Sequence, residues 1–292
     1  MPSARDLAAN IPWRIKIGAK LVLSRLPLDY GFWRRVGWFR LGDMDNPEYA
    51  FAVVKRHFER VSASRNDEGL VALEVGPGDS VCSAMIAFAF GVRATVLVDA
   101  GRFARQDSEA YRAMAVYLEK RGFAVPRLKE TITMEDVLGS CHAQYLTDGL
   151  ASLRALQKES VHFVWSHHVL EHIKRCEFVD VMREVRRILR PDGVCSHSVD
   201  LKDNLSDALN NLRFSERVWE SPFMARSGFY TNRLRYSEMR DIFRRTGFEV
   251  DVIEVARWDE LPTPREKMSD EFRRFSDEDL LVSEFDVILR PE

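Results

Sequence analysis

The sequence predicts an α/β fold, a doubly wound and mostly parallel sheet of seven strands. Two observations carry this prediction. From about residue 70 onward, short apolar runs alternate with segments of helical period, and a glycine-rich turn follows the first of these runs directly. Strands and helices that alternate in this way build a parallel sheet covered by helices on both faces. With 292 residues, 46% of them hydrophobic, the chain can fill the core of such a domain.

Each element rests on its own pattern. Strands are expected where apolar residues lie between turn residues, at residues 70–75, 94–98, 143–146, 161–165, 194–199, 248–255 and 281–289. An apolar helix is expected after the glycine turn, and amphipathic helices are expected at residues 109–121, 178–189 and 237–246. Pro191-Asp192-Gly193 and Gly247 supply stop signals after the last two of these helices.

Two regions lie outside this alternation. Residues 1–68 are expected to form an N-terminal helical appendage, with amphipathic helices at residues 14–25 and 49–61. Residues 69–292 then form the main domain. Within it, residues 202–236 are polar and aromatic without a strand pattern, so we expect an insertion after the fifth strand.

Composition and charge exclude several classes of protein. The 43 Lys and Arg residues against 45 Asp and Glu give a net charge of −2, whereas a general nucleic-acid-binding protein carries a basic surplus. The 4 cysteines form no CxxC pair, which favours a reducing compartment over disulfides or a zinc knuckle. The longest uncharged run, residues 80–92, falls short of the about 20 residues of a membrane span. We therefore expect a cytoplasmic protein without a nucleic-acid partner.

The most informative stretch is Leu73-Glu74-Val75-Gly76-Pro77-Gly78-Asp79-Ser80. A glycine-rich turn between a strand and a helix lets a ligand approach the backbone at the carboxyl edge of the sheet. Asp99 closes the second strand, where its carboxylate can accept hydrogen bonds from ribose hydroxyls. A dinucleotide fingerprint would need glycine at Val81, and Glu74 would repel a pyrophosphate. The turn therefore favours a cationic ligand.

Taken in order, these segments resemble the class I S-adenosylmethionine-dependent methyltransferases over about residues 70–290. Residues 74–80 resemble their first motif and residues 145–150 the motif of strand three. Residues 161–172 resemble the motif of strand four, and residues 188–193 the turn before strand five. The resemblance implies S-adenosylmethionine as the cofactor, and it implies these binding residues: Glu74, Gly76, Pro77, Gly78, Asp79, Asp99, Asp148 and Ser166.

The resemblance also implies methyl transfer to an acceptor, which we expect to be a small molecule or a glycan methylated on oxygen. An oxygen acceptor must lose a proton, and base candidates at the carboxyl edge are His168, His197 and Asp200. His197 with Asp200 is favoured because imidazole titrates near neutral pH. Residues 196–201 weakly resemble methyltransferases of bacterial surface-glycan assembly. One departure from the family is His162, where an Asp is usual.

Two alternatives remain open. One is a methyltransferase-like protein that binds the cofactor without turnover. The other is a zinc-dependent peptidase, because residues 168–172 read H-x-x-E-H and a helix would put His168 and His172 on one face beside Glu171. We rank the peptidase lower because no second helix offers a clear third ligand, and we expect no metal site.

The first 45 residues carry eight Arg or Lys against four Asp, with interleaved Trp and Tyr. Their amphipathic stretch at residues 13–26 fits either a peripheral membrane anchor or a lid over the cofactor edge. We favour the lid, because amphipathic stripes of globular chains usually bury against their own core. Aromatic residues of the insertion are expected to help cover the acceptor pocket: Trp219, Phe223, Phe229 and Tyr230. The oligomeric state is left open.

Overall fold

A computed structural model of the protein describes residues 15, 17–18, 43–62, 69–129 and 132–292. In this part of the chain, seven strands form one sheet in the order β3-β2-β1-β4-β5-β7-β6. The strands are β1 (Val71–Val75), β2 (Ala94–Val98), β3 (Ala143–Leu146), β4 (Val161–His167), β5 (Leu189–Asp200), β6 (Phe248–Arg257) and β7 (Val282–Pro291). Neighbouring strands are parallel, except that β7 runs antiparallel to both β5 and β6. The predicted doubly wound, mostly parallel sheet is confirmed.

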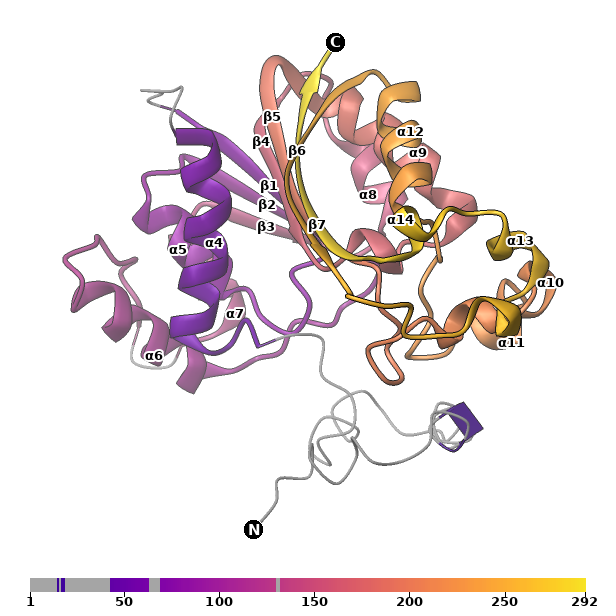
Figure 1. The fold of residues 1–292 in the computed structure, drawn as a ribbon. Helices are drawn as coiled ribbons and strands as arrows, with labels where there is room; N and C mark the ends of the chain where they lie inside the picture. Colours follow the sequence, from indigo (N-terminus) through magenta and orange to yellow (C-terminus); the bar gives the residue numbers. More distant parts are fainter. Residues whose placement is uncertain (1–14, 16, 19–42, 63–68, 130–131) are drawn as a thin grey trace.

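Helices cover the sheet on both faces (Figure 1). One layer holds α4 (Pro47–Ser62), α5 (Cys82–Ala89), α6 (Ser108–Glu119) and α7 (Met134–Ser140). The other holds α8 (Leu150–Ala155), α9 (Arg175–Ile188) and α12 (Tyr236–Arg245). A separate hydrophobic core fills the space between the sheet and each layer. The layers leave the carboxyl ends of the parallel strands as a common edge, where ligands bind in folds of this type.

The predicted strands and the three amphipathic helices are all found, shifted by a few residues at their ends. β4 runs two residues farther than its apolar run suggests, through the buried Ser166 to His167, and β5 begins five residues earlier, at Leu189. The sequence did not predict α7 and α8, which have 7 and 6 residues. Helices of this length are too short to display a helical period.

The helix predicted at residues 49–61 is α4, and it belongs to the layer that covers β4 and β5. Phe58 packs edge-on against Phe163 of β4 with ring centroids 4.9 Å apart, and Phe51 and Val54 are buried beside it. The predicted boundary at residue 68 lies outside the described residues. So do nearly all of the predicted helix at residues 14–25 and the proposed lid or anchor. Among the described helices, none is long and apolar enough to cross a membrane.

The insertion after β5 contains short helices only, as its sequence suggested: η2 (Asn210–Arg213), α10 (Glu216–Trp219) and α11 (Pro222–Ala225). Its aromatic residues do not line a ligand cleft as expected. Trp219, Phe229 and Tyr230 bury against one another, and the Trp219 indole donates a hydrogen bond to the Thr231 carbonyl at 2.7 Å. Phe223 points to solvent with 53% of its surface exposed. These residues stabilise the insertion itself.

The remaining short elements precede or follow the last strands. They are η1 (Leu170–His172) after β4, and η3 (Arg265–Lys267), α13 (Asp270–Arg273) and α14 (Asp277–Leu280) between β6 and β7. The buried Arg235 side chain donates one hydrogen bond to the Leu201 carbonyl, just after β5, at 3.2 Å and another to the Val282 carbonyl, at the start of β7, at 2.8 Å. One side chain thereby fixes the end of β5 against the start of β7.

Two histidines are buried on opposite faces of the sheet, His57 of α4 on one face and His197 of β5 on the other. On the α4 face, His57 Nδ1 lies 2.8 Å from Ser196 Oγ; on the other face, His197 Nδ1 lies 2.7 Å from Ser166 Oγ. Both rings are 0% exposed. Burial lowers the pKa of His197 to about 3 and holds the pKa of His57 well below its ordinary value. His197 is therefore a neutral structural residue, and its burial argues against the base role expected from the sequence.

These histidines predict acid sensitivity. The pKa of His197 drops from about 6.5 in the unfolded chain to about 3 in the folded protein. Its contribution to stability is therefore complete above about pH 6.5 and is lost as the pH falls toward about 3. Replacing His197 by Gln should lower the pH dependence of the unfolding free energy by about 1.4 kcal/mol per pH unit in this window.

Urea unfolding at a series of pH values from 7.5 to 4.5 measures this slope. The exposed His142, replaced by Asn because its φ is 51°, is the control that should keep the wild-type slope. An unchanged slope in His197→Gln would show that the imidazole is not held neutral.

Candidate functional site

The turn after β1 is built from glycines that no other residue could replace without strain. Gly76 and Gly78 have φ values of +74° and +66°. A Cβ atom on Gly76 would lie 2.5 Å from Val169 Cγ1, far inside van der Waals contact. The Gly76 amide donates to the Val98 carbonyl at 2.8 Å, which fixes the turn to the end of β2. The turn therefore exposes bare backbone at the carboxyl edge of the sheet.

Asp99 follows β2 and closes over this turn. Its carboxylate accepts hydrogen bonds from the Gly78 amide at 3.1 Å and from the Ala100 amide at 2.7 Å. Burial raises the pKa of Asp99 to about 6, against the effect of these two donors. A carboxylate has about four lone-pair sites, so two remain for hydroxyl donors of a ligand. The structure thus brings Asp99 and the glycine turn together, as the sequence indicated.

Glu74 lies against α5, where Ser83 donates a hydrogen bond to its carboxylate. It is 2% exposed, and burial raises its pKa to about 8. The group is therefore largely protonated at neutral pH, and a cationic ligand nearby would favour its ionised form. Pro77 and Asp79 are buried within the same turn.

The other two expected cofactor residues differ in accessibility. Asp148 is exposed just after β3, and the amide of its neighbour Gly149 donates to the Asp99 carbonyl at 2.8 Å. Asp148 therefore stands next to the strand end that carries Asp99. The Ser166 side chain is 0% exposed and bonded to His197 inside the sheet. Its burial argues against the side-chain contact to the cofactor that the sequence suggested.

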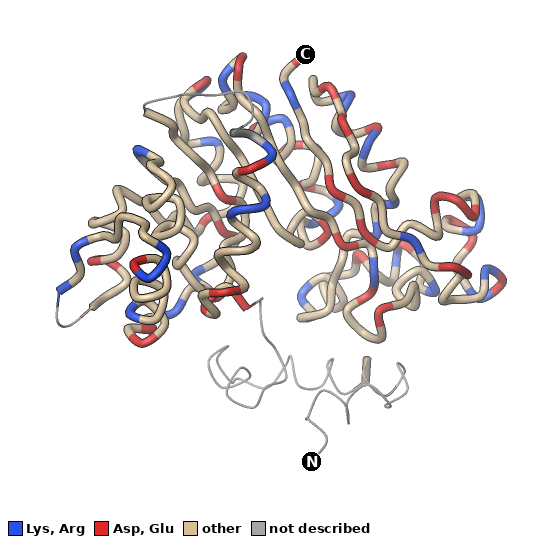
Figure 2. Tube along the Cα trace, turned by 60° about the vertical axis from the view of Figure 1, so that its left-hand side comes forward, with Lys and Arg blue, Asp and Glu red and all other residues tan. Residues whose placement is uncertain are grey.

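A cleft of about 300 Å³ opens on the α4 side, where β4 and β5 end. Its outer wall is the β6–β7 pair, along which Asp and Glu residues recur (Figure 2). The polar residues of the cleft come from α4 and from four strands and their ends: Tyr49, Arg56, His167, His168, Ser198, Glu254, Glu284 and Asp286. Ser198 Oγ is buried and has no hydrogen-bond partner among the described residues. A polar ligand in the cleft would supply one.

Three consecutive residues connect this cleft to the glycine turn. His167 and His168 line the cleft with their rings stacked at 4.1 Å, and Val169 packs on Gly76. His168 turns the chain with a left-handed φ of 52°, and its amide donates to the Ser198 carbonyl at 2.9 Å. The glycine turn and the cleft are therefore parts of one continuous site.

The structure separates the three expected bases. His168 lines the cleft, and burial lowers its pKa while Asp200 opposes that shift. Asp200 ends β5, 3.5 Å from Lys202 Nζ, and Lys202 also pairs with Glu284. His197, as described above, is sealed within the sheet. Two of the three residues thus remain near the cleft.

The cleft also contains a side-chain pair that the sequence did not predict. The Tyr49 hydroxyl of α4 lies 3.2 Å from Nε2 of His167, the last residue of β4. The place of His167 beside His168 at a strand end was a usable signal. Tyr49 gave none, because it lies 118 positions away and reaches the site only through the packing of α4.

The H-x-x-E-H sequence does not form the helix that a zinc peptidase of this type requires. Residues Leu170–His172 make a single 3₁₀ turn, and the left-handed His168 precedes it. His172 Nδ1 donates to the Tyr230 carbonyl at 3.0 Å, and Glu171 is buried. In the described part of the chain, no three His, Cys, Asp or Glu residues are grouped to hold a metal ion.

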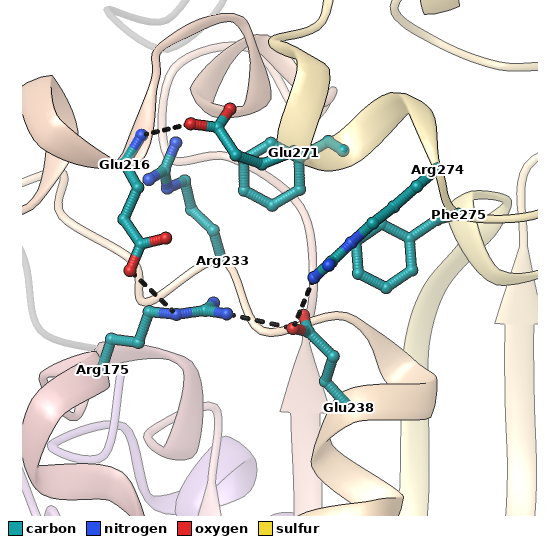
Figure 3. Close-up of a pocket in the computed structure, with 8 residues that line it drawn as sticks. Arg175, Glu216, Arg233, Glu238, Glu271, Arg274 and Phe275 are labelled. Atoms are coloured by element: carbon teal, nitrogen blue, oxygen red, sulfur yellow. Dashed lines mark hydrogen bonds and ion pairs between the residues drawn. The ribbon is translucent and has the colours of Figure 1, made fainter.

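A second, smaller cavity of about 130 Å³ lies between α9, α12 and the insertion (Figure 3). Arginines and glutamates alternate around it. Arg175 contacts Glu238 at 3.0 Å and Glu216 at 3.8 Å, and Arg274 approaches Glu238 at 3.7 Å. These opposite charges satisfy one another, and they tie the insertion to α9 and α12.

Comparisons with known proteins agree with this architecture. A family model described as a methyltransferase domain matches residues 73–196, and a search of the curated proteins gives no match. Among solved structures, the chain is similar to the YcgJ protein of Bacillus subtilis, with 15% identity over 82% of this chain and 99% of that one and a TM-score of 0.42.

Two further solved structures are similar at the same level. A SAM-dependent methyltransferase of Methanosarcina mazei shares 16% identity over 79% of this chain and 96% of that one, with a TM-score of 0.46. The phosphoethanolamine N-methyltransferase 2 of Haemonchus contortus, solved with phosphomonomethylethanolamine and S-adenosylhomocysteine, shares 15% identity over 82% and 53%, with a TM-score of 0.47.

The matched residues 73–196 run from β1 to β5 and include the glycine turn, Asp99 and the end of β4. The zinc-peptidase alternative lacks its helix, and the mostly parallel sheet of seven strands is the one that the sequence predicted. The chain is a class I S-adenosylmethionine-dependent methyltransferase.

Proposed function

We propose that the protein methylates an oxygen atom of a small-molecule or glycan acceptor bound in the cleft beside α4. One observation carries the proposal: residues His167 to Val169 join that cleft directly to the glycine turn. A donor held on the turn and an acceptor held in the cleft would meet at this junction. Methyl transfer needs such proximity, with the reacting atoms about 3–3.5 Å apart and in line.

The residues of the turn fit S-adenosylmethionine, which supplies a methyl group activated on a sulfonium. The left-handed backbone of Gly76 and Gly78, which carries no side chain, lets the methionine part of the cofactor approach the turn closely. Asp99 keeps acceptor sites for the ribose hydroxyls, and the exposed Asp148 is placed for the adenine amino group. Glu74, Pro77 and Asp79 shape the turn from below, with Glu74 able to respond to the positive charge.

The cleft itself favours a compact, hydroxyl-bearing acceptor. Its volume of about 300 Å³ is in the range of small-ligand sites. Ser198 Oγ awaits a partner, Arg56 lines one wall and Glu254 another, so both hydrogen-bond donors and acceptors face the ligand. His168 and Asp200 stay candidates for positioning the acceptor or holding its proton.

The proposal also covers the class of partner, the compartment and contact with membranes. The net charge of −2 supports a small acceptor rather than a nucleic acid. All four cysteines are free thiols, three of them buried, which supports a reducing, cytoplasmic compartment. Membrane contact through the first 45 residues stays a prediction, since they lie outside the described residues apart from a few positions.

Substitution of Gly76 tests cofactor binding. S-adenosylhomocysteine should bind the wild type in the micromolar range, about −8 kcal/mol. Gly76→Ala should weaken binding at least tenfold, because its Cβ would collide with Val169 and force the turn out of the conformation that receives the ligand. Calorimetric titration measures the affinity.

Gly91→Ala is the matched control for backbone strain. Gly91 has a similar φ of +81°, but a Cβ there would meet nothing within 4 Å. Both variants bear the strain of a left-handed alanine, and only Gly76→Ala should lose the ligand. Equal affinity in the two variants would contradict the assignment of the turn.

Asp99→Asn tests the ribose contact through its pH dependence. The pKa of Asp99 is raised to about 6, so protonation at lower pH removes an acceptor that the ribose hydroxyls need. Wild-type affinity for S-adenosylhomocysteine should fall between about pH 7.5 and pH 5, and Asp99→Asn should bind about tenfold more weakly with a flatter profile. Asp259→Asn, an exposed residue after β6, should follow the wild type.

Turnover decides between an enzyme and a protein that only binds the cofactor. The full chain is mixed with S-adenosylmethionine and with catechol, methyl glucoside or, as the nitrogen acceptor, an amine without a hydroxyl group such as butylamine, and S-adenosylhomocysteine is quantified. We expect formation above the acceptor-free rate with a hydroxyl compound. Tight binding of S-adenosylhomocysteine without any turnover would favour the binding-only alternative, and turnover with the amine nitrogen alone would overturn the oxygen assignment.

A further inference from the structure

We propose that Tyr49 and His167 are the acid–base pair of the reaction, with the Tyr49 hydroxyl receiving the acceptor's proton and His167 Nε2 taking the tyrosine's own. The inference rests on the proposed function, because it needs an acceptor hydroxyl in the cleft. It differs from the sequence-based expectation, which named His168, His197 and Asp200.

The geometry of the pair comes from two elements that pack on each other. Tyr49 stands in the first turn of α4, with its amide bonded to Asn46 Oδ1 at 3.1 Å. His167 is the last residue of β4. Their polar atoms are 3.2 Å apart, their rings meet edge-on with centroids 6.2 Å apart, and both side chains line the cleft. The hydroxyl is therefore held at the cleft wall.

The two partners differ in access, as a proton relay requires. Tyr49 is 38% exposed and can meet a ligand, whereas His167 lies behind it, largely buried. The inner nitrogen, His167 Nδ1, has no hydrogen-bond partner among the described residues, and neither has Nε2 of His57. The ring centroids of His57 and His167 are 5.9 Å apart. A neutral His167 that carries its hydrogen on Nδ1 offers the lone pair of Nε2 to the Tyr49 hydroxyl.

The surroundings keep His167 neutral. Burial is the main cause that lowers the pKa of His167, to about 3, and His168, Arg56 and Arg60 lower it further while Asp286 opposes them. A neutral imidazole always offers its lone pair at physiological pH. It is still basic enough, because an oxygen that has gained a methyl group and kept its proton is a far stronger acid than an imidazolium.

The proposed step balances in atoms and charge. A lone pair of the acceptor oxygen forms the bond to the methyl carbon as the sulfur–carbon bond breaks, and that bond's electrons stay on sulfur. The acceptor's O–H electrons stay on its oxygen, its proton passes to the Tyr49 oxygen, and the Tyr49 proton passes to His167 Nε2. The positive charge thus moves from the sulfonium to the imidazolium, near Asp286, and leaves as a proton to water after product release.

The other polar groups of the cleft are less suited to this task. Glu284 pairs with Lys202 and Asp286 with Arg60. Glu254 stands on β6 in the outer wall, and Asp200 does not line the cleft. His168 stacks on His167 and serves the turn toward Val169. Tyr49 and His167 form a neutral, bonded pair that faces the ligand.

Nitrogen NMR of the full chain tests the pair without an acceptor. In histidine-labelled protein saturated with S-adenosylhomocysteine, His167 should carry its hydrogen on Nδ1 and a hydrogen-bonded lone pair on Nε2 from about pH 5.5 to pH 8. Tyr49→Phe should shift the Nε2 resonance toward that of a free lone pair. Tyr117→Phe, whose hydroxyl has no hydrogen bond with the described residues, should not. A hydrogen found on Nε2, or an imidazolium at pH 7, would overturn the proposal.

Kinetics with the hydroxyl compound turned over by the wild type test the role. Tyr49→Phe and His167→Gln should each lower kcat about 100-fold, the usual scale of general acid–base catalysis. KM for S-adenosylmethionine should change less than about threefold, and Tyr117→Phe should match the wild type. A wild-type kcat in both variants would contradict the proposed acid–base role of Tyr49 and His167. If the proposed function is wrong, the wild type itself shows no turnover. The NMR experiment still tests the hydrogen bond between Tyr49 and His167 in that case.

Discussion

The contact between Val169 and Gly76 is the constraint on which the site depends. The methyl groups of Val169 fill the space that any side chain at residue 76 would occupy. The turn after β1 can therefore pack against the chain after β4 only if residue 76 is glycine. Parallel pairing of β1 with β4 sets these two strand ends side by side. The left-handed His168 then carries the chain from this contact to the cleft. Donor and acceptor regions are thereby held in one frame.

A second constraint comes from neutral histidines inside the protein. His57 and His197 sit on opposite faces of β5, each with its Nδ1 bonded to one serine of a central strand. Such pairs are stable only while uncharged, because a buried imidazolium without a carboxylate partner is costly. The same low-polarity surroundings extend to His167 at the end of β4. The imidazole at the end of β4 is therefore a neutral group, which suits a reaction whose donor already brings a positive charge.

The sequence predicted the parts of the protein that local patterns determine. The strands, the three amphipathic helices and the pairing of Gly76 with Asp99 all follow from short apolar runs, turn residues and the parallel arrangement. The errors concern side-chain direction and distant packing. His197 lies within the predicted fifth strand and Ser166 just past the predicted end of the fourth. Their hydrogen bond to each other across the sheet, and not their place near a strand end, accounts for their burial. The insertion's aromatic residues face one another because a region without strands needs a core of its own.

The cofactor and acceptor sides of the site differ in how they are encoded. Gly76, Gly78 and Asp99 lie within a single β-α-β unit, so that one stretch of sequence holds the whole cofactor signature. The cleft is assembled from α4, β4, β5 and the β6–β7 pair, which are spread over most of the chain. Tyr49 meets His167 only because Phe51, Val54 and Phe58 anchor α4 to the sheet. Changes in the anchoring of one helix would therefore reshape the cleft while the glycine turn stays intact, because α4 lines the cleft and packs into the same core as the sheet.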